Sequence, residues 1–281
     1  SDGSSGEEVM NILVVTQYFW PENFRINDLV EGMIARGHQV TVLTGQPNYP
    51  AGQFFTGYGW RGPREESYKG AHILRVPLVA RGKQKSFRLA LNFFSFALFA
   101  TLAVWFRLPR TKTFDVIFVF EISPITVGIP AAAARRKFEA PILFWVLDLW
   151  PETLSAVGAV KNKLALLPIE ALVRWIYRRC DRILVASRGF IPEVLCYGGV
   201  AQNIRYFPNW GEQIFDAPPT AIDSADLPEL PAGLRLVYAG NIGEAQDFPA
   251  ILDAAEHLRD RTDIQWVIVG DGRLSAWVRA E

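Results

Sequence analysis

Short apolar, β-branched runs alternate along this chain with segments whose apolar residues recur at helical spacing. This alternation predicts βαβ units, and therefore an α/β fold with a parallel sheet. The predicted strands are Asn11–Thr16, Gln39–Thr44, His72–Val76, Phe114–Phe120, Pro141–Val146, Arg182–Ala186 and Asn203–Tyr206. The predicted helices are Phe24–Arg36, Ile125–Phe138, Lys163–Arg179 and Phe190–Tyr197.

The pattern stops at Gly211 and resumes at Leu234. The residues between them are rich in Pro, Ala, Asp and Glu and lack periodicity, which is typical of an interdomain linker. The second stretch predicts strands Leu234–Ala239 and Ile264–Val269, a helix Asp247–Leu258 and another helix starting near Arg273. We therefore predict a first domain over 10–210, a linker over 211–233 and a truncated second domain over 234–281. Residues 1–9 resemble a vector-derived leader or a disordered start.

Composition narrows the class of protein. With 281 residues, 50% of them hydrophobic, the chain can bury a substantial core in two units. Its formal net charge is zero, so it has no overall attraction for nucleic acid. The two cysteines support neither a disulfide framework nor a zinc cluster, which favours a reducing cytoplasm. The three histidines lack ligand spacing, so we expect no metal.

Polar and aromatic residues follow several of the predicted strands. Ligands of parallel sheets bind beyond the carboxyl ends of the strands, because loops and helix N-termini converge there. Rings interleaved with carboxylates and amides suit a sugar, although each ring could instead plug the sheet edge beside solvated charges. The candidate acceptor-binding residues in these loops are Glu22, Asn23, Arg25, Asn48, Tyr49 and Glu121.

Glycines mark a different kind of site. The turn after the first strand contains none, which weighs against a dinucleotide-dependent oxidoreductase. In the second domain, by contrast, both predicted strands run into glycine turns, at 240–243 and 270–272. Backbone N–H groups at such turns can hold a pyrophosphate.

Several stretches together resemble glycosyltransferase family 4, of retaining mechanism and GT-B fold, and within it the colanic acid, O-antigen and fucosamine transferase type. They are Gln17–Arg25, Pro47–Pro50, Asp148–Glu152, Phe207–Trp210, Gly240–Phe248 and Gly270–Gly272. The resemblance implies an N-terminal Rossmann-like domain for the acceptor and a second Rossmann-like domain for a UDP- or GDP-linked sugar. It implies no metal and no further cofactor.

The resemblance also implies roles for particular residues. Gly240, Asn241 and Gly243 would approach the diphosphate with Gln246 nearby, and Gly270 and Asp271 would lie near the nucleoside. Leu147 stands where many relatives carry histidine, so Asp148 or Glu152 would take the polar role at the reacting sugar. Asp148 could instead cap the helix that begins at Trp150 or Pro151. The loop after the Gly-Asn turn lacks the basic residue of many relatives, and the paired glutamates of the family would lie beyond Glu281.

The stretch Leu89–Phe106 contains no charged residue and approaches the length of a membrane span. A crossing would separate strands of one sheet, so we expect a shallow dip or a surface helix, with a buried core helix as the alternative. Ser67–Phe114 carries nine basic residues and no acidic one, which favours an anionic lipid surface. The predicted membrane residues are Arg81, Lys83, Lys85, Arg88, Phe93, Phe94, Leu98, Phe99, Trp105 and Arg107.

These observations predict a retaining glycosyltransferase peripheral or monotopic on the inner face of the cytoplasmic membrane. It would move a sugar from a nucleotide sugar to a polyprenyl-diphosphate-linked saccharide in surface polysaccharide biosynthesis. A truncated second domain would leave this chain inactive alone. The alternative is a catalytically degenerate, membrane-bound scaffold of the same fold, which Leu147 and the missing basic residue would explain.

Overall fold

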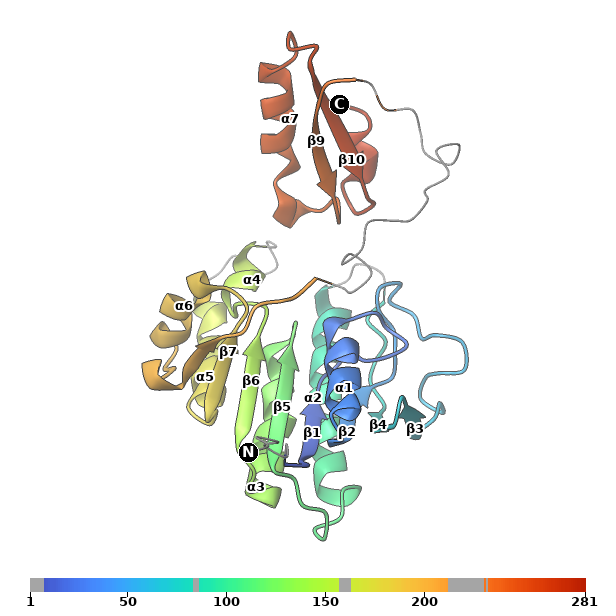
Figure 1. Ribbon diagram of the computed structural model, residues 1–281, viewed down its shortest axis with the longest axis vertical. Helices are drawn as coiled ribbons and strands as arrows, with labels where there is room; N and C mark the ends of the chain where they lie inside the picture. Colours follow the sequence, from blue (N-terminus) through green and yellow to red (C-terminus); the bar gives the residue numbers. More distant parts are fainter. Residues whose placement is uncertain (1–7, 83–85, 157–162, 212–229, 231) are drawn as a thin grey trace, which may run out of the picture. The chain divides into compact units, whose positions relative to one another are not determined.

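The computed structural model of the chain describes residues 8–82, 86–156, 163–211, 230 and 232–281. The described residues fall into two compact units, one ending at Asn209 and the other beginning at Trp210 (Figure 1). Residues 1–7, most of the predicted linker and the predicted membrane residues Lys83 and Lys85 lie outside the described part of the chain.

The larger unit is built on an eight-stranded sheet. Its strands are β1 (Asn11–Val15), β2 (Gln39–Gly45), β3 (Glu65–Tyr68), β4 (Ala71–Val76), β5 (Val116–Glu121), β6 (Ile142–Val146), β7 (Arg182–Val185) and β8 (Ile204–Tyr206). Their order is β3-β4-β2-β1-β5-β6-β7-β8. All neighbours pair in parallel except β3 and β4, so seven strands end at the same edge of the sheet.

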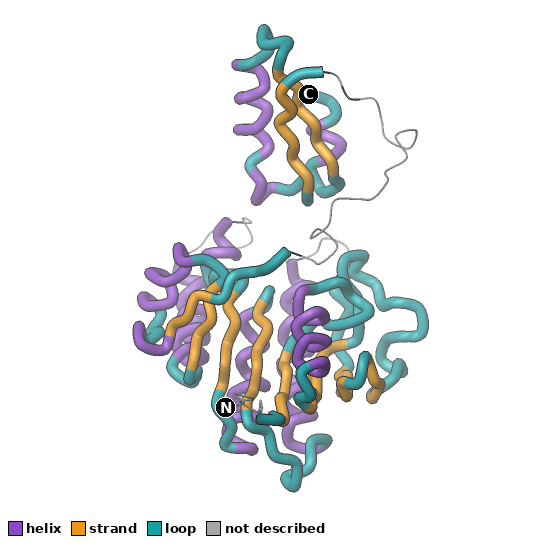
Figure 2. The backbone as a smooth tube through the Cα atoms, viewed as in Figure 1, coloured by secondary structure: helices purple, strands orange, loops and turns teal. Residues whose placement is uncertain are grey.

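Helices cover both faces of this sheet (Figures 1 and 2). They are α1 (Arg25–Ala35), α2 (Ser86–Phe106), α3 (Gly128–Phe138), α4 (Glu152–Ala156), α5 (Lys163–Tyr177) and α6 (Ile191–Cys196). Successive strand residues point to opposite faces, so Leu13 and Val15 join the apolar core that α2, α3 and α5 complete. Val14, which lies between them, is fully buried on the opposite face.

The smaller unit contains two parallel strands, β9 (Leu234–Ala239) and β10 (Ile264–Val269). The helix α7 (Phe248–His257) follows β9, and the short helix α8 (Ser275–Val278) follows β10. Phe248 is fully buried and its ring packs edge-on against Tyr238, with ring centroids 5.0 Å apart. Both units therefore have the βα arrangement that the hydrophobic pattern predicts.

The α/β fold and all nine predicted strands are confirmed, with ends that differ by at most two residues. The edge strand β3 was not expected, because Glu65 and Glu66 interrupt its apolar pattern. The last helix was expected to run from near Arg273 to Glu281, but α8 covers only Ser275–Val278.

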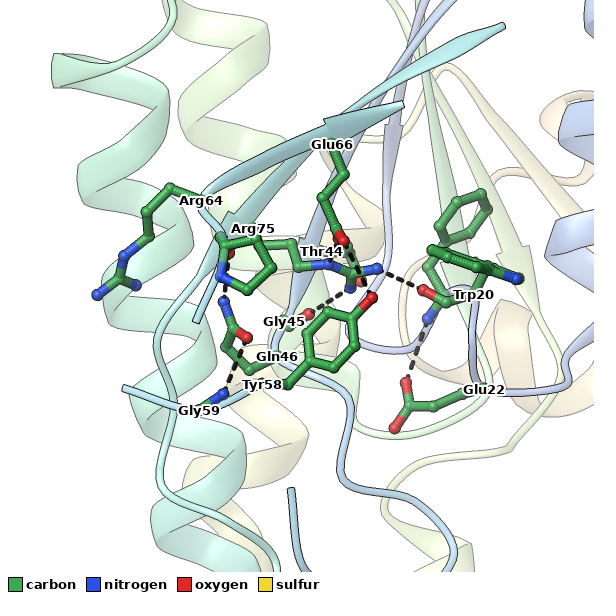
Figure 3. A network of polar contacts seen from close by, with 12 residues as sticks. Trp20, Glu22, Thr44, Gly45, Gln46, Tyr58, Gly59, Arg64, Glu66 and Arg75 are labelled. Carbon is green, nitrogen blue, oxygen red and sulfur yellow. Dashed lines mark hydrogen bonds and ion pairs between the residues drawn. The ribbon is translucent and has the colours of Figure 1, made fainter. Parts of the chain in front are cut away.

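A buried arginine connects the outer strands to the first loop (Figure 3). The side chain of Arg75 in β4 is fully buried and pairs with the Glu66 carboxylate of β3. Its guanidinium also donates to the main-chain oxygens of Gly45, at 3.0 Å, and Trp20. Tyr58 completes the group, because its hydroxyl donates to Glu66 at 3.0 Å while its ring lies 5.0 Å from the guanidinium carbon. This network fixes β3 and the loop after β1 on the sheet.

Replacing Arg75 with methionine should lower the free energy of unfolding by about 3 kcal/mol or more, because Glu66 and two carbonyls would lose their buried partner. Urea unfolding measures the change. The matched control is Arg36→Met, at an exposed arginine on the end of α1, which should change stability by less than about 0.5 kcal/mol. Equal losses in the two variants would contradict the structural role of the network.

Candidate functional site

Glu22 joins the loops that follow β1 and β2. It is only 2% exposed, and its carboxylate accepts backbone N–H groups from Asn48 at 2.8 Å, Tyr49 at 2.7 Å and Phe19 at 3.3 Å. Burial nevertheless outweighs these three donors and raises the pKa of Glu22 to about 7. Glu22 thus supports the two loops from beneath, and its side chain is not open to a ligand.

Asn48 is a second buried support. It is fully buried, and its side-chain oxygen accepts from the backbone N–H of Arg81 at 3.0 Å and from the Asn92 amide at 3.4 Å. Asn92 in turn donates to the Val79 carbonyl at 2.7 Å and accepts from the Gln17 amide at 2.6 Å. Polar groups of α2 therefore hold the loops after β1 and β2 in place.

Aromatic, basic and amide side chains remain accessible in these loops and in the adjacent segment after β4. The Tyr49 side chain is 37% exposed and its ring packs against Tyr18 and Phe24, with centroids 5.7 and 5.2 Å away. The Arg81 guanidinium carbon lies 5.3 Å from the Tyr49 ring. Asn23 is exposed at the same edge, and Arg25 forms an ion pair with Asp28 at 3.6 Å. An aromatic platform with an adjacent guanidinium suits stacking on a sugar face.

A group of buried acids lies at the ends of β5 and β6. Glu121 is fully buried, and the polar groups nearest its carboxyl are backbone amides and the side chain of Asp148. Burial, and secondarily the nearby Asp148, raise the pKa of Glu121 well above its usual range, although the backbone amides of 147, 148 and 123 act against this. Burial also raises the pKa of the half-buried Asp148, against a hydrogen bond from Ser123. The two carboxyl groups therefore favour a protonated Glu121 beside Asp148.

The surroundings of these acids are also polar. The Trp150 indole donates to the Ser123 hydroxyl at 3.2 Å. Glu152, the first residue of α4, accepts from the Tyr197 hydroxyl at 2.7 Å, while its other carboxyl oxygen and the Tyr177 hydroxyl are buried without a described partner. Ser123 has a positive φ of 102°, which is uncommon outside glycine and concentrates at functional sites. The sequence pattern indicated Asp148 and Glu152. Tyr177, the last residue of α5, and Tyr197, directly after α6, gave no signal.

The two glycine turns of the smaller unit lie against each other. The N–H of Gly240 donates to the Val269 carbonyl, and the N–H of Ile242 donates to the Asp271 carbonyl, both at 2.9 Å. A Cβ atom on Gly270 would lie 1.8 Å from the Gly240 oxygen, so the turns approach too closely for any side chain there. The predicted donor-binding residues Gly240, Asn241, Gly243, Gln246, Gly270 and Asp271 are thus brought together in one place.

Side chains complete this pair of turns. Asn241 donates to the Gln246 side chain at 3.1 Å, across Gly243. Asp271 accepts from the Ser275 hydroxyl at 2.7 Å and from the Gly272 N–H at 2.8 Å, and these hydrogen bonds lower its pKa. Arg273, which the sequence analysis did not single out, reaches the first turn through an ion pair with Glu244 at 3.2 Å. A guanidinium therefore stands beside the turn that lacks a basic residue of its own.

The predicted membrane residues that the structure describes differ in exposure. Phe94 and Leu98 are exposed on α2, and Arg88 is exposed near its start. The prediction for Phe93 is wrong, because this residue is 8% exposed and its ring packs against Trp150. Phe99, Trp105, Arg81 and Arg107 are half-buried. Arg107 is tied to the main-chain oxygens of Arg75 and Arg64.

Among the described residues, no group of three or more His, Cys, Asp or Glu side chains could hold a metal ion. Separately, Asp148 lies close enough to Glu121 to raise the pKa of Glu121. Carboxyl groups in such a pair are able to exchange protons and to stabilise positive charge.

Residues 23–210 match the family described as glycosyl transferase 4-like domain, and the chain belongs to this family. A protein of Escherichia coli (strain K12) named as a colanic acid biosynthesis glycosyl transferase, WcaI, is 29% identical over 279 residues. The match covers 94% of this chain and 66% of that protein, so the chain spans just under two thirds of its relative.

Solved structures show the same fold. Sucrose-phosphate synthase from Thermosynechococcus elongatus is 13% identical with a TM-score of 0.53, over 93% of this chain and 71% of that one. HepE from Anabaena, in complex with UDP-glucose, has the same identity and TM-score, over 93% and 61% of the two chains. Starch synthase IV from Arabidopsis thaliana, bound to ADP and acarbose, is 11% identical with a TM-score of 0.55, over 97% and 71%. The chain has the GT-B fold of these structures.

The raised pKa of Glu22 predicts a pH-dependent stability. Unfolded Glu22 loses its proton near 4.5 and folded Glu22 near 7, so the folded state binds more protons in between. The free energy of unfolding should therefore fall by about 3 kcal/mol as the pH rises through this window, and level off above it. Glu22→Gln should lack this component when both proteins are unfolded in urea at several pH values. If the free energy of unfolding changed with pH in the same way in both proteins, Glu22 would not be the source of the pH dependence.

Proposed function

We propose that the protein is a retaining glycosyltransferase of surface polysaccharide biosynthesis. It takes a sugar from a UDP- or GDP-linked donor and transfers it to a polyprenyl-diphosphate-linked saccharide. The observation that carries this proposal is the pair of interlocked glycine turns with Arg273 beside them, in a chain of the glycosyl transferase 4-like family. The resemblance to a colanic acid transferase supports the biosynthetic context, and HepE with UDP-glucose supports the class of donor.

The smaller unit has the parts needed to hold a nucleotide diphosphate. Glycine backbone approaches a phosphate closely because no Cβ intervenes, and the dipole of α7 favours negative charge near its first turn. Arg273 can leave Glu244 for the diphosphate, since both side chains are at least half exposed. A guanidinium gives paired hydrogen bonds to phosphate oxygens, which also neutralises the leaving group.

The acids at the ends of β5 and β6 are suited to the reacting sugar. Retaining transfer passes through a state with positive charge at the anomeric carbon, and a carboxylate nearby stabilises that charge. In this proposal Asp148 is the ionised group, and it also orients the acceptor hydroxyl. Glu121 remains protonated beneath it, because burial and Asp148 both disfavour a second charge.

The second candidate is a catalytically degenerate scaffold of the same fold. It is favoured by Leu147, an apolar side chain directly before Asp148, at a position where the family resemblance implies histidine. A scaffold would retain the fold and the glycine turns without turnover. Donor binding without transfer or hydrolysis of any nucleotide sugar would support it.

Nucleotide sugars should raise the thermal unfolding temperature of the protein, because a ligand that binds only the folded state stabilises it. Arg273→Gln should weaken this binding about tenfold, since one charge-assisted contact to the diphosphate is lost. The matched control is Arg259→Gln, which breaks a comparable exposed ion pair with Glu256 in the same unit. Equal affinities in the two variants would remove Arg273 from the donor site.

Asp148→Asn should lower kcat about a hundredfold while leaving nucleotide-sugar affinity unchanged, because the proposed role is in the transition state. Asp253→Asn, at an exposed aspartate of α7, serves as a control and should retain full turnover. Donor affinity is measured alongside by thermal unfolding. An Asp148→Asn enzyme with undiminished kcat would contradict the role of this carboxylate.

A further inference from the structure

The helix α2 has two apolar sides, and the described residues cover only one of them. Phe96, Ala100 and Val104 are buried in the core of the larger unit. The opposite side bears six large apolar side chains, exposed by 39% to 82% and spaced three or four residues apart. This exposed stripe consists of Phe87, Leu91, Phe94, Leu98, Leu102 and Phe106.

The covered side fixes α2 to the sheet. Among the described residues, Phe87–Phe106 is the one helix long and apolar enough to cross a membrane, and 39% of its apolar window is buried in the fold. Asn92 on this side is fully buried and bonded to Gln17 and Val79. A crossing would break these contacts and expose the core, so α2 can meet a bilayer only along its stripe.

Two grooves flank the stripe. The smaller, of about 300 Å³, lies beside Phe99, Leu102 and Phe106 and includes Arg64 and Arg107. The larger, of about 770 Å³, is bounded by Trp105 and Trp175. Its charged residues are Arg135, Arg136 and Arg179 with Glu139 and Asp181, and Arg135 is paired with Asp181.

Basic residues also stand at both ends of α2. Arg88 and Arg110 are exposed at its start and just beyond its end, and Ser67–Phe114 contains no acidic residue. A second copy of the chain placed on the stripe would bring these like charges together, which is unfavourable. Anionic headgroups would neutralise them, and tryptophan is favoured at the depth of those headgroups.

We propose that the exposed stripe of α2 docks onto the surface of a bilayer containing anionic lipid, such as the inner face of the cytoplasmic membrane. Phe94 and Leu98 enter the boundary between headgroups and acyl chains, while the flanking arginines contact the headgroups. This docking uses no residue of the glycine turns or of the acids near β5 and β6. It therefore stands apart from the proposed transfer reaction and holds or fails without it.

The experiment measures binding of the protein to vesicles by cosedimentation, with no substrate present. Vesicles of phosphatidylglycerol mixed with phosphatidylcholine are compared with phosphatidylcholine alone, at low and high salt. Phe94→Asp with Leu98→Asp removes two exposed apolar side chains and adds two negative charges. The matched control, Leu167→Asp with Leu195→Asp, makes the same change at exposed leucines on α5 and α6.

We expect the unaltered protein to bind the anionic vesicles more tightly than the neutral ones, and less tightly at high salt. The stripe variant should lose at least about tenfold in partitioning, because two large apolar groups no longer enter the bilayer. The control should bind like the unaltered protein, and both variants should keep its thermal unfolding midpoint. Absence of vesicle binding, equal loss in both variants, or a dimer in light scattering that the stripe variant dissociates would overturn the proposal.

Discussion

The parallel alignment of β1 between β2 and β5 is the constraint on which the larger unit depends. Because the strands run in one direction, the loops after β1, β2, β5 and β6 all emerge at one edge of the sheet. Residues far apart in sequence thereby become neighbours. Glu22 lies beside Asn48, and Glu121 lies near Asp148. The chemistry of the unit is assembled at this edge, and the helices on the two faces keep the sheet rigid beneath it.

Burial decides what the polar residues at this edge can do. Glu22 and Asn48 lie under the loops and exchange hydrogen bonds with backbone groups, so they determine loop shape. Glu121 is fully buried near Asp148, and burial raises its pKa even though the backbone amides of 147, 148 and 123 oppose the shift. A carboxyl group whose pKa is strongly raised by burial beside a second acid is a candidate for a chemical role.

The hydrophobic pattern predicted the sheet because its strands are continuous apolar runs between turn residues. It missed β3, whose glutamates face solvent or Arg75, and it treated Arg75 as one of nine surface charges although the fold buries it against Glu66. It also could not separate Phe93 from Phe94, because a helix that is apolar all round carries no signal for its covered side. Arg273 was missed because its contact with Glu244 spans 29 residues of sequence.

Sugar transfer itself tests most directly whether the protein is a retaining glycosyltransferase. The full-length protein is mixed with a UDP- or GDP-linked sugar carrying a radiolabel and with a polyprenyl-diphosphate-linked saccharide in vesicles, and the label in the lipid fraction is measured. We expect labelled lipid in which the new glycosidic bond keeps the anomeric configuration of the donor. A donor that binds the protein but gives neither labelled lipid nor free sugar, across the nucleotide sugars of both classes, would contradict this expectation.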